Sequence, residues 1–234
     1  MKEGALKQNL NTGKNRMNHT KLKVKGILFD LDGTIVNSKE AYLEAAKTAF
    51  QAMGQKPPSM QTALEIPKRL EQNQPIDDII KANTQQFLDV YLKTYYAVTE
   101  VKTSPMPNVA ATLRTLQQKA KLALITMRYV PKAAVIRELE QFSLAKYFTH
   151  IITALDTHKP KPSPEALIQA LKAMDVQICY CLIVGDSVAD IKAGKAAGAK
   201  TVAVLSGLFS HEELAKEHPD LILKDVTQLP NYIQ

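Results

Sequence analysis

Four short segments of the sequence hold residues that can ligate a metal ion, attack an electrophile or neutralise an anion. They are Asp-Leu-Asp-Gly-Thr at 30–34, Thr126, Lys-Pro-Lys-Pro-Ser-Pro at 159–164 and Gly-Asp-Ser-Val-Ala-Asp at 185–190. Each segment lies at the end of an apolar run typical of a buried strand, or in the loop after it. The loops beyond the carboxyl ends of parallel strands form the ligand crevice of an open α/β sheet, so we expect the four segments to meet there.

These residue types favour phosphoryl transfer assisted by a hard metal ion. Asp30 and Asp186, at the ends of buried strands, would repel each other unless a cation lay between them. A site with only oxygen ligands favours Mg²⁺, which keeps several waters and contacts the substrate phosphate. Gly33 lets the backbone approach an anion closely. Thr126 can donate to a phosphoryl oxygen, and Lys161 can neutralise developing charge.

The elements that must position these residues alternate along the chain. Periodic apolar stripes predict helices, and apolar runs predict strands at 25–30, 122–126, 150–153, 181–184 and 201–205. This alternation indicates an α/β core with a parallel sheet that is covered by helices on both faces. The segment at about 39–104 breaks the alternation with helical patterns alone, including 41–53 and 79–96, and predicts an inserted helical bundle.

The four segments resemble, in their order, the motifs of the haloacid dehalogenase superfamily and of its phosphatase branch in particular. The similarity covers residues of about 25–234, and the ordered set is far more specific than one motif, since acidic turns and helix N-caps are common. It implies a doubly wound, Rossmann-like α/β core at 23–38 and 105–234, with the first strand at its centre. It also implies an all-helical cap domain at 39–104 that closes over the site and selects the substrate.

The resemblance gives a role to each site residue. Asp30 would attack phosphorus and form an aspartyl-phosphate, and Asp32 would protonate the leaving oxygen and then activate water. Mg²⁺ would be held by the Asp30 carboxylate, the Asp32 backbone carbonyl and Asp186. Asp190 would orient the lysine or a water on the metal. Contacts to the substrate phosphate are expected from Gly33, Thr126, Met127 and Lys161.

Two positions depart from the family pattern. An asparagine usually follows the motif-two threonine, where this chain has Met127 and then Arg128. An acid commonly stands where this chain has Asn37. Neither change removes the nucleophile, but both are expected to alter contacts to the phosphate or to the leaving group.

The catalytic lysine has two candidates, because Lys159 and Lys161 each begin a Lys-Pro-x-Pro segment. Lys161 runs directly into the helix expected to begin near Glu165, and prolines at a first helical turn fix the approach of the chain. The family register also places the lysine before Pro-x-Pro and a helix start. We therefore favour Lys161 and expect Lys159 to be a solvated charge.

These features favour an Mg²⁺-dependent phosphatase that acts on a small phosphorylated metabolite. The segment Val-Leu-Ser-Gly at 204–207 adds a weaker similarity to phosphoglycolate and pyrophosphate phosphatases. A dehalogenase or a phosphonate hydrolase is disfavoured, because those branches lack an acid at the position of Asp32. A sugar phosphomutase keeps that acid and stays open, and release of inorganic phosphate would distinguish the two. A catalytically idle binding protein is disfavoured because Asp30, Asp32 and Lys161 are all present.

The net charge of +7 is concentrated at the N-terminus. Residues 1–25 hold seven basic residues against Glu3 alone, a local charge of +6. The polar, basic segment 1–22 is therefore expected to be a disordered tail, not a surface for nucleic acid. No apolar run reaches the roughly 18 to 20 residues of a membrane span, and no secretory signal is recognisable. We expect a cytoplasmic enzyme whose partner is a small phosphorylated metabolite, neither a nucleic acid nor a membrane. Whether it is a monomer or a homodimer stays open.

Overall fold

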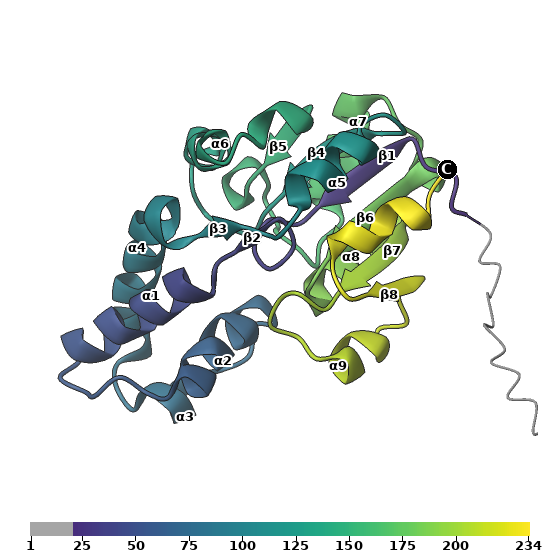
Figure 1. Cartoon of the computed structure of the whole chain (residues 1–234). Coiled ribbons are helices and arrows are strands. Elements are labelled where there is room, and N and C mark those ends of the chain that lie inside the picture. Colours follow the sequence, from purple (N-terminus) through teal and green to yellow (C-terminus); the bar gives the residue numbers. More distant parts are fainter. Residues whose placement is uncertain (1–20) are drawn as a thin grey trace, which may run out of the picture.

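The computed structural model describes residues 21–234, in which a parallel sheet carries a helical insert at one end (Figure 1). The sheet has six strands in the order β5-β4-β1-β6-β7-β8, and every neighbouring pair is parallel. Its strands are β1 (Gly26–Phe29), β4 (Lys121–Ile125), β5 (His150–Ile152), β6 (Cys181–Gly185), β7 (Lys200–Val204) and β8 (Leu221–Leu223). The predicted parallel α/β sheet with its first strand at the centre is confirmed.

Helices cover both faces of the sheet because successive side chains of a strand point to opposite faces. Ile27 and Phe29 of β1 pack in one apolar cluster with α5 and α6, whereas Leu28 packs in another with α7 and α8. This two-sided burial is the doubly wound arrangement that the sequence predicts. The helices of this part are α5 (Val109–Leu116), α6 (Lys132–Gln141), α7 (Glu165–Met174), α8 (Val188–Ala197) and α9 (His211–Ala215). Short 3-10 turns are η1 (Ala145–Tyr147), η2 (Ala154–Asp156), η3 (Ile178–Tyr180) and η4 (Val226–Asn231).

The helical insert lies beyond the carboxyl ends of the strands (Figure 1). It is flanked by a short antiparallel pair, β2 (Val36–Asn37) and β3 (Ser104–Pro105). The insert has an apolar core of its own, in which the rings of Tyr42 and Tyr95 stack with their centroids 4.8 Å apart. Its helices are α1 (Lys39–Ala52), α2 (Met60–Glu71), α3 (Asp77–Ile80) and α4 (Thr84–Lys102), all within the segment predicted to be helical.

Two details of the insert differ from the prediction. The helix expected at 79–96 is two helices, because Lys81 adopts a left-handed backbone conformation (φ 42°) that ends α3 and the Asn83 side chain then caps α4. Helix α2 was not predicted as a separate helix. It contains Pro67 in its interior, where the sequence pattern suggests a break.

The N-terminal tail predicted at 1–22 lies outside the described residues up to residue 20. Leu22 belongs to the folded part, since its amide donates to the Tyr232 carbonyl at 2.8 Å and it forms a β-bridge with Ile233. Within residues 21–234, no helix combines the length and the apolar character needed to cross a bilayer.

Candidate active site

The sheet brings three of the predicted motifs together at one edge. Asp30 follows β1, Thr126 follows β4 and Asp186 follows β6, and β1 lies between the other two strands. All three side chains are buried. The central position of β1 therefore places Asp30 between the two neighbouring strand ends.

Lys161 completes this cluster from the loop before α7. Its ammonium lies 2.5 Å from Asp30 Oδ1 and 2.6 Å from Asp190 Oδ1, and it also donates to the Ile125 carbonyl at 3.3 Å. The residue is only 3% exposed, and its two carboxylate partners outweigh burial and raise its pKa. Lys159 is exposed, and its backbone amide donates to Glu165. Of the two candidate lysines, Lys161 is the one beside Asp30.

The start of α8 holds Asp190 in place. Ser187 caps this helix, and its amide and hydroxyl donate to Asp190 Oδ2 at 3.1 and 2.7 Å in a capping box. The other oxygen of Asp190 accepts from Lys161. Asp190 therefore uses both oxygens within the protein and fixes the direction of the lysine, the position expected of a residue behind the reacting groups.

Two glycines allow Asp186 to enter the cluster. A Cβ atom at Gly33 would lie 2.5 Å from Asp186 Oδ2, and one at Gly207 would lie 1.6 Å from it, so neither position has room for a side chain. Gly33 also has a positive φ of 81°. Its amide donates to the Val36 carbonyl at 2.8 Å. The structure thus gives Gly33 a packing role against Asp186, and its contact with phosphate stays a prediction.

The carboxylates of this cluster fit a hard divalent cation. Oxygens of Asp30, Asp186 and Asp190 lie within 4.8 Å of one another. Burial, opposed by Lys161, raises the pKa of Asp30 to about 7, and burial together with Asp30 raises the pKa of Asp186. Since Asp190 uses both oxygens in contacts to Lys161 and Ser187, Asp30 and Asp186 are the side chains left to ligate a divalent metal ion. The Asp32 carbonyl stays the predicted third ligand.

The Asp32 carboxylate is held by a side chain that was not expected to touch it. Arg128 binds it with a bidentate fork, Nε at 2.8 Å from Oδ2 and Nη2 at 2.6 Å from Oδ1, and the Ser38 hydroxyl also donates to it. These partners, Arg128 above all, outweigh burial and lower the pKa of Asp32. On its other side Arg128 contacts Glu138 of α6, which accepts from Thr103 at 2.5 Å. A buried chain of charges and hydrogen bonds thus reaches from Asp32 to the end of the insert.

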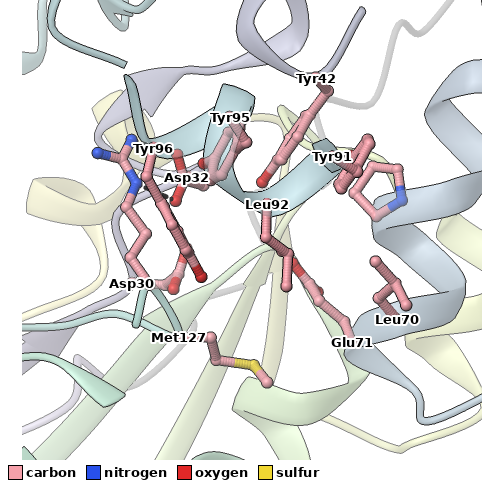
Figure 2. A pocket seen from close by; sticks show the side chains of 12 residues that line it. Asp30, Asp32, Tyr42, Leu70, Glu71, Tyr91, Leu92, Tyr95, Tyr96 and Met127 are labelled. Carbon is pink, nitrogen blue, oxygen red and sulfur yellow. Dashed lines mark hydrogen bonds and ion pairs between the residues drawn. The ribbon is translucent and has the colours of Figure 1, made fainter. Parts of the chain in front are cut away.

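A cavity of about 140 Å³ opens over Asp30 and Asp32 (Figure 2). Met127 and Arg128 line it from the sheet side, and the insert supplies the rest of its wall. The residues from the insert are Tyr42, Pro67, Leu70, Glu71, Tyr91, Leu92, Tyr95 and Tyr96. The predicted reacting groups thus face a partly open space that the sheet and the insert share.

Comparison with known proteins agrees with this geometry. Residues 27–204 match the family model described as haloacid dehalogenase-like hydrolase. The chain belongs to the haloacid dehalogenase-like hydrolases. A phosphoglycolate phosphatase of Escherichia coli K12 is 32% identical to it, over 88% of this chain and 91% of the relative. A Clostridium perfringens protein named as a pyrophosphatase (PpaX) is 29% identical, over 90% and 98%.

Solved structures show the same fold. A haloacid dehalogenase-like family hydrolase from Streptococcus pneumoniae superposes with a TM-score of 0.76 at 20% identity, over 91% of this chain and 99% of that chain. The family and the names of its relatives make this haloacid dehalogenase-like hydrolase an enzyme of the phosphatase type.

In this haloacid dehalogenase-like hydrolase the two remaining predicted phosphate contacts lie at the end of β4. The Thr126 hydroxyl accepts from the Arg128 amide at 3.1 Å, and Met127 borders the cavity. Sequence reasoning treated Arg128 only as a departure from the family pattern and gave Glu138 no role. A charged residue among the buried apolar positions Val135 and Leu139 of α6 is the signal that would have found Glu138.

Proposed function

We propose that this protein is an Mg²⁺-dependent phosphatase that hydrolyses the phosphate monoester of a small metabolite, of the size of phosphoglycolate, in the cytoplasm. The observation that carries the proposal is the buried bridge from Asp30 through Lys161 to Asp190, with Asp186 in the same cluster. A nucleophilic carboxylate, a fixed cation and a second carboxylate for the metal are the parts that phosphoryl transfer requires.

The reaction proceeds in two displacements at phosphorus. Arg128 favours the ionised form of Asp32, so Asp32 must first take up a proton from solvent. An oxygen of Asp30 then attacks the phosphoryl group, and the bond to the ester oxygen breaks while Asp32 gives that oxygen the proton. Asp32 then takes a proton from water, which attacks the aspartyl-phosphate and releases inorganic phosphate and free Asp30. Mg²⁺, when bound by Asp30 and Asp186, supplies positive charge for the phosphoryl oxygens. Lys161 adds the fixed charge of its ammonium beside Asp30.

Arg128 has a positioning part in this scheme. Its fork fixes the plane of the Asp32 carboxylate, and Glu138 fixes the guanidinium in turn. The acid is therefore oriented before a substrate arrives, which reduces the reorganisation needed in the transition state.

The test measures inorganic phosphate released with Mg²⁺ from p-nitrophenyl phosphate and from a panel of small phosphate esters that includes phosphoglycolate and pyrophosphate. The wild-type protein should release phosphate, and Asp30→Asn should release none while its circular dichroism spectrum stays that of the folded protein. Wild-type rates from Asp30→Asn would exclude Asp30 as the nucleophile. Isomerisation of a sugar phosphate without phosphate release would contradict the hydrolase itself.

A further inference from the structure

The wall of the cavity opposite Asp30 contains polar atoms without partners. Glu71 is the last residue of α2, and Figure 2 shows its side chain directed into the cavity, across from Asp30. In the described part of the chain, its buried Oε2 atom has no hydrogen-bond partner, and neither have the hydroxyls of Tyr91 and Tyr95 on α4, which line the same cavity. Buried polar atoms without partners are costly and rare in folded proteins. Three of them around one cavity therefore indicate a place where a ligand supplies the missing bonds.

The charge of the cavity restricts which ligand that is. Three carboxylates line it, from Asp30, Asp32 and Glu71, against the single guanidinium of Arg128. Arg128 is already engaged by Asp32 and Glu138. Among the described residues, no lining cation is left over for a negatively charged leaving group.

The remaining wall is apolar and the space is small. Leu70, Leu92 and Met127 present carbon atoms to the same cavity as Glu71. Its volume of about 140 Å³ is well below the roughly 300–1,000 Å³ typical of pockets that hold drug-sized ligands. A short carbon chain with one polar end fits this combination.

We propose that Glu71, with the Tyr91 hydroxyl beside it on the cavity wall, forms a leaving-group subsite for a small alcohol that carries a hydroxyl or an ammonium group. This rests on the proposed function, since the alcohol is what leaves phosphorus when Asp30 attacks in the first displacement. The substrate class is then the phosphate monoester of a small uncharged or cationic alcohol. Phosphoglycolate and pyrophosphate have anionic leaving groups, which would meet the carboxylate of Glu71 with no unpaired cationic side chain among the described residues that line the cavity.

The test compares kcat/KM for four esters of similar size. Glycerol 3-phosphate presents hydroxyl groups, phosphoethanolamine presents an ammonium, n-propyl phosphate presents neither, and phosphoglycolate presents a carboxylate. The wild-type protein should favour at least one of the first two over the last two by about tenfold or more, the contribution expected of a hydrogen bond to a charged group. The faster of the first two tells which donor the subsite takes.

Substitution then ties the preference to the residue. Glu71→Gln should bring the ratio of kcat/KM between the preferred ester and n-propyl phosphate close to one. The same substitution should raise kcat/KM for phosphoglycolate relative to kcat/KM for n-propyl phosphate. Glu65→Gln is the matched control, because Glu65 lies on the same helix and pairs at the surface with Lys68 and Arg69. It should leave all four values unchanged.

Different results would contradict the subsite and the phosphatase activity. Phosphate release from all four esters at equal kcat/KM, or fastest from phosphoglycolate, would overturn the subsite while leaving the phosphatase intact. An equal loss on all four esters in Glu71→Gln would also overturn it, since Glu71 would then serve the whole site. No release from these esters or from p-nitrophenyl phosphate would overturn the proposed function, and the subsite with it.

Discussion

The two sides of the cavity are built in opposite ways. On the sheet side, the reacting groups are tied to one another: Lys161 to Asp30 and Asp190, and Arg128 to Asp32 and Glu138. On the insert side, Glu71 and Tyr91 have buried polar atoms without a partner. In the proposed reaction, the catalytic groups are therefore ordered before the substrate arrives. The subsite proposed for the alcohol instead leaves hydrogen bonds for the substrate to complete.

Removal of the metal ion should reduce activity the most, and it acts only on the residues of the sheet side. A chelator should abolish phosphate release, and Mg²⁺ should restore it. Ca²⁺ should restore it poorly, since its looser coordination misplaces the attacking carboxylate. Binding of Mg²⁺ should also raise the melting temperature, because it offsets the burial and the mutual repulsion that raise the pKa of Asp30 and Asp186. Full activity in metal-free buffer would refute this account.

Loss of the fixed ammonium should come next. Lys161→Ala removes a cation held 2.5 Å from Asp30 and should lower kcat about a hundredfold or more. Lys159→Ala is the control from the same loop and should be nearly silent, because Lys159 is exposed. Rates would be measured on protein shown by circular dichroism to be folded. The reverse order of the two variants would move the catalytic lysine to the other Lys-Pro unit.

Loss of the bidentate contact from Arg128 to Asp32 should reduce activity by an amount that depends on the leaving group. Arg128→Lys keeps the charge but cannot bind a carboxylate bidentately, so kcat for an alkyl phosphate should fall about tenfold or more with KM little changed. p-Nitrophenyl phosphate should suffer less, because its leaving oxygen needs little protonation. Arg137→Lys, in the surface pair with Glu100, is the control and should change neither substrate. An equal loss on both substrates would show that Arg128 does not act through Asp32.

The smallest effect is expected from the N-terminal segment. Deletion of residues 1–20 removes the polar, basic sequence that we expect to be a tail. The melting temperature and kcat/KM on a small ester should stay nearly unchanged. A large loss of kcat/KM would make this segment part of the working enzyme.

The sequence predicts the sheet side far better than the insert side, for physical reasons. Buried strands read as apolar runs, and chemistry at their ends follows from the geometry of parallel sheets, so Asp30, Thr126 and Asp186 could be placed together. No comparable rule predicts the arrangement of the helices in the insert from their sequence. Helix α2 contains Pro67, and the break at Lys81 depends on a left-handed backbone conformation that the periodicity of apolar residues does not reveal.

Ion pairs between residues far apart in the chain could not be predicted from the sequence either. Arg128 and Asp32 are 96 positions apart, and they meet only because β4 and β1 are neighbours in the sheet. Glu138 reaches Arg128 because α6 packs on the same face. Such partners follow from the tertiary structure, whereas Asp30 and Lys161 stand in motifs that can be read directly from the chain.

The short pair of strands β2 and β3 has a mechanical consequence. The chain crosses between sheet and insert only twice within the described residues, just after β2 and just before β3. Ser38 at the first crossing donates to Asp32, and Thr103 at the second donates to Glu138, the residue behind Arg128. Any rotation of the insert about these crossings would displace Ser38 and Thr103, which stand at the two ends of the network that would orient the Asp32 carboxylate. A substrate too large for the insert to close over it would therefore leave Asp32 poorly oriented for proton transfer. The same two crossings would in this way couple the size of the substrate to proton donation.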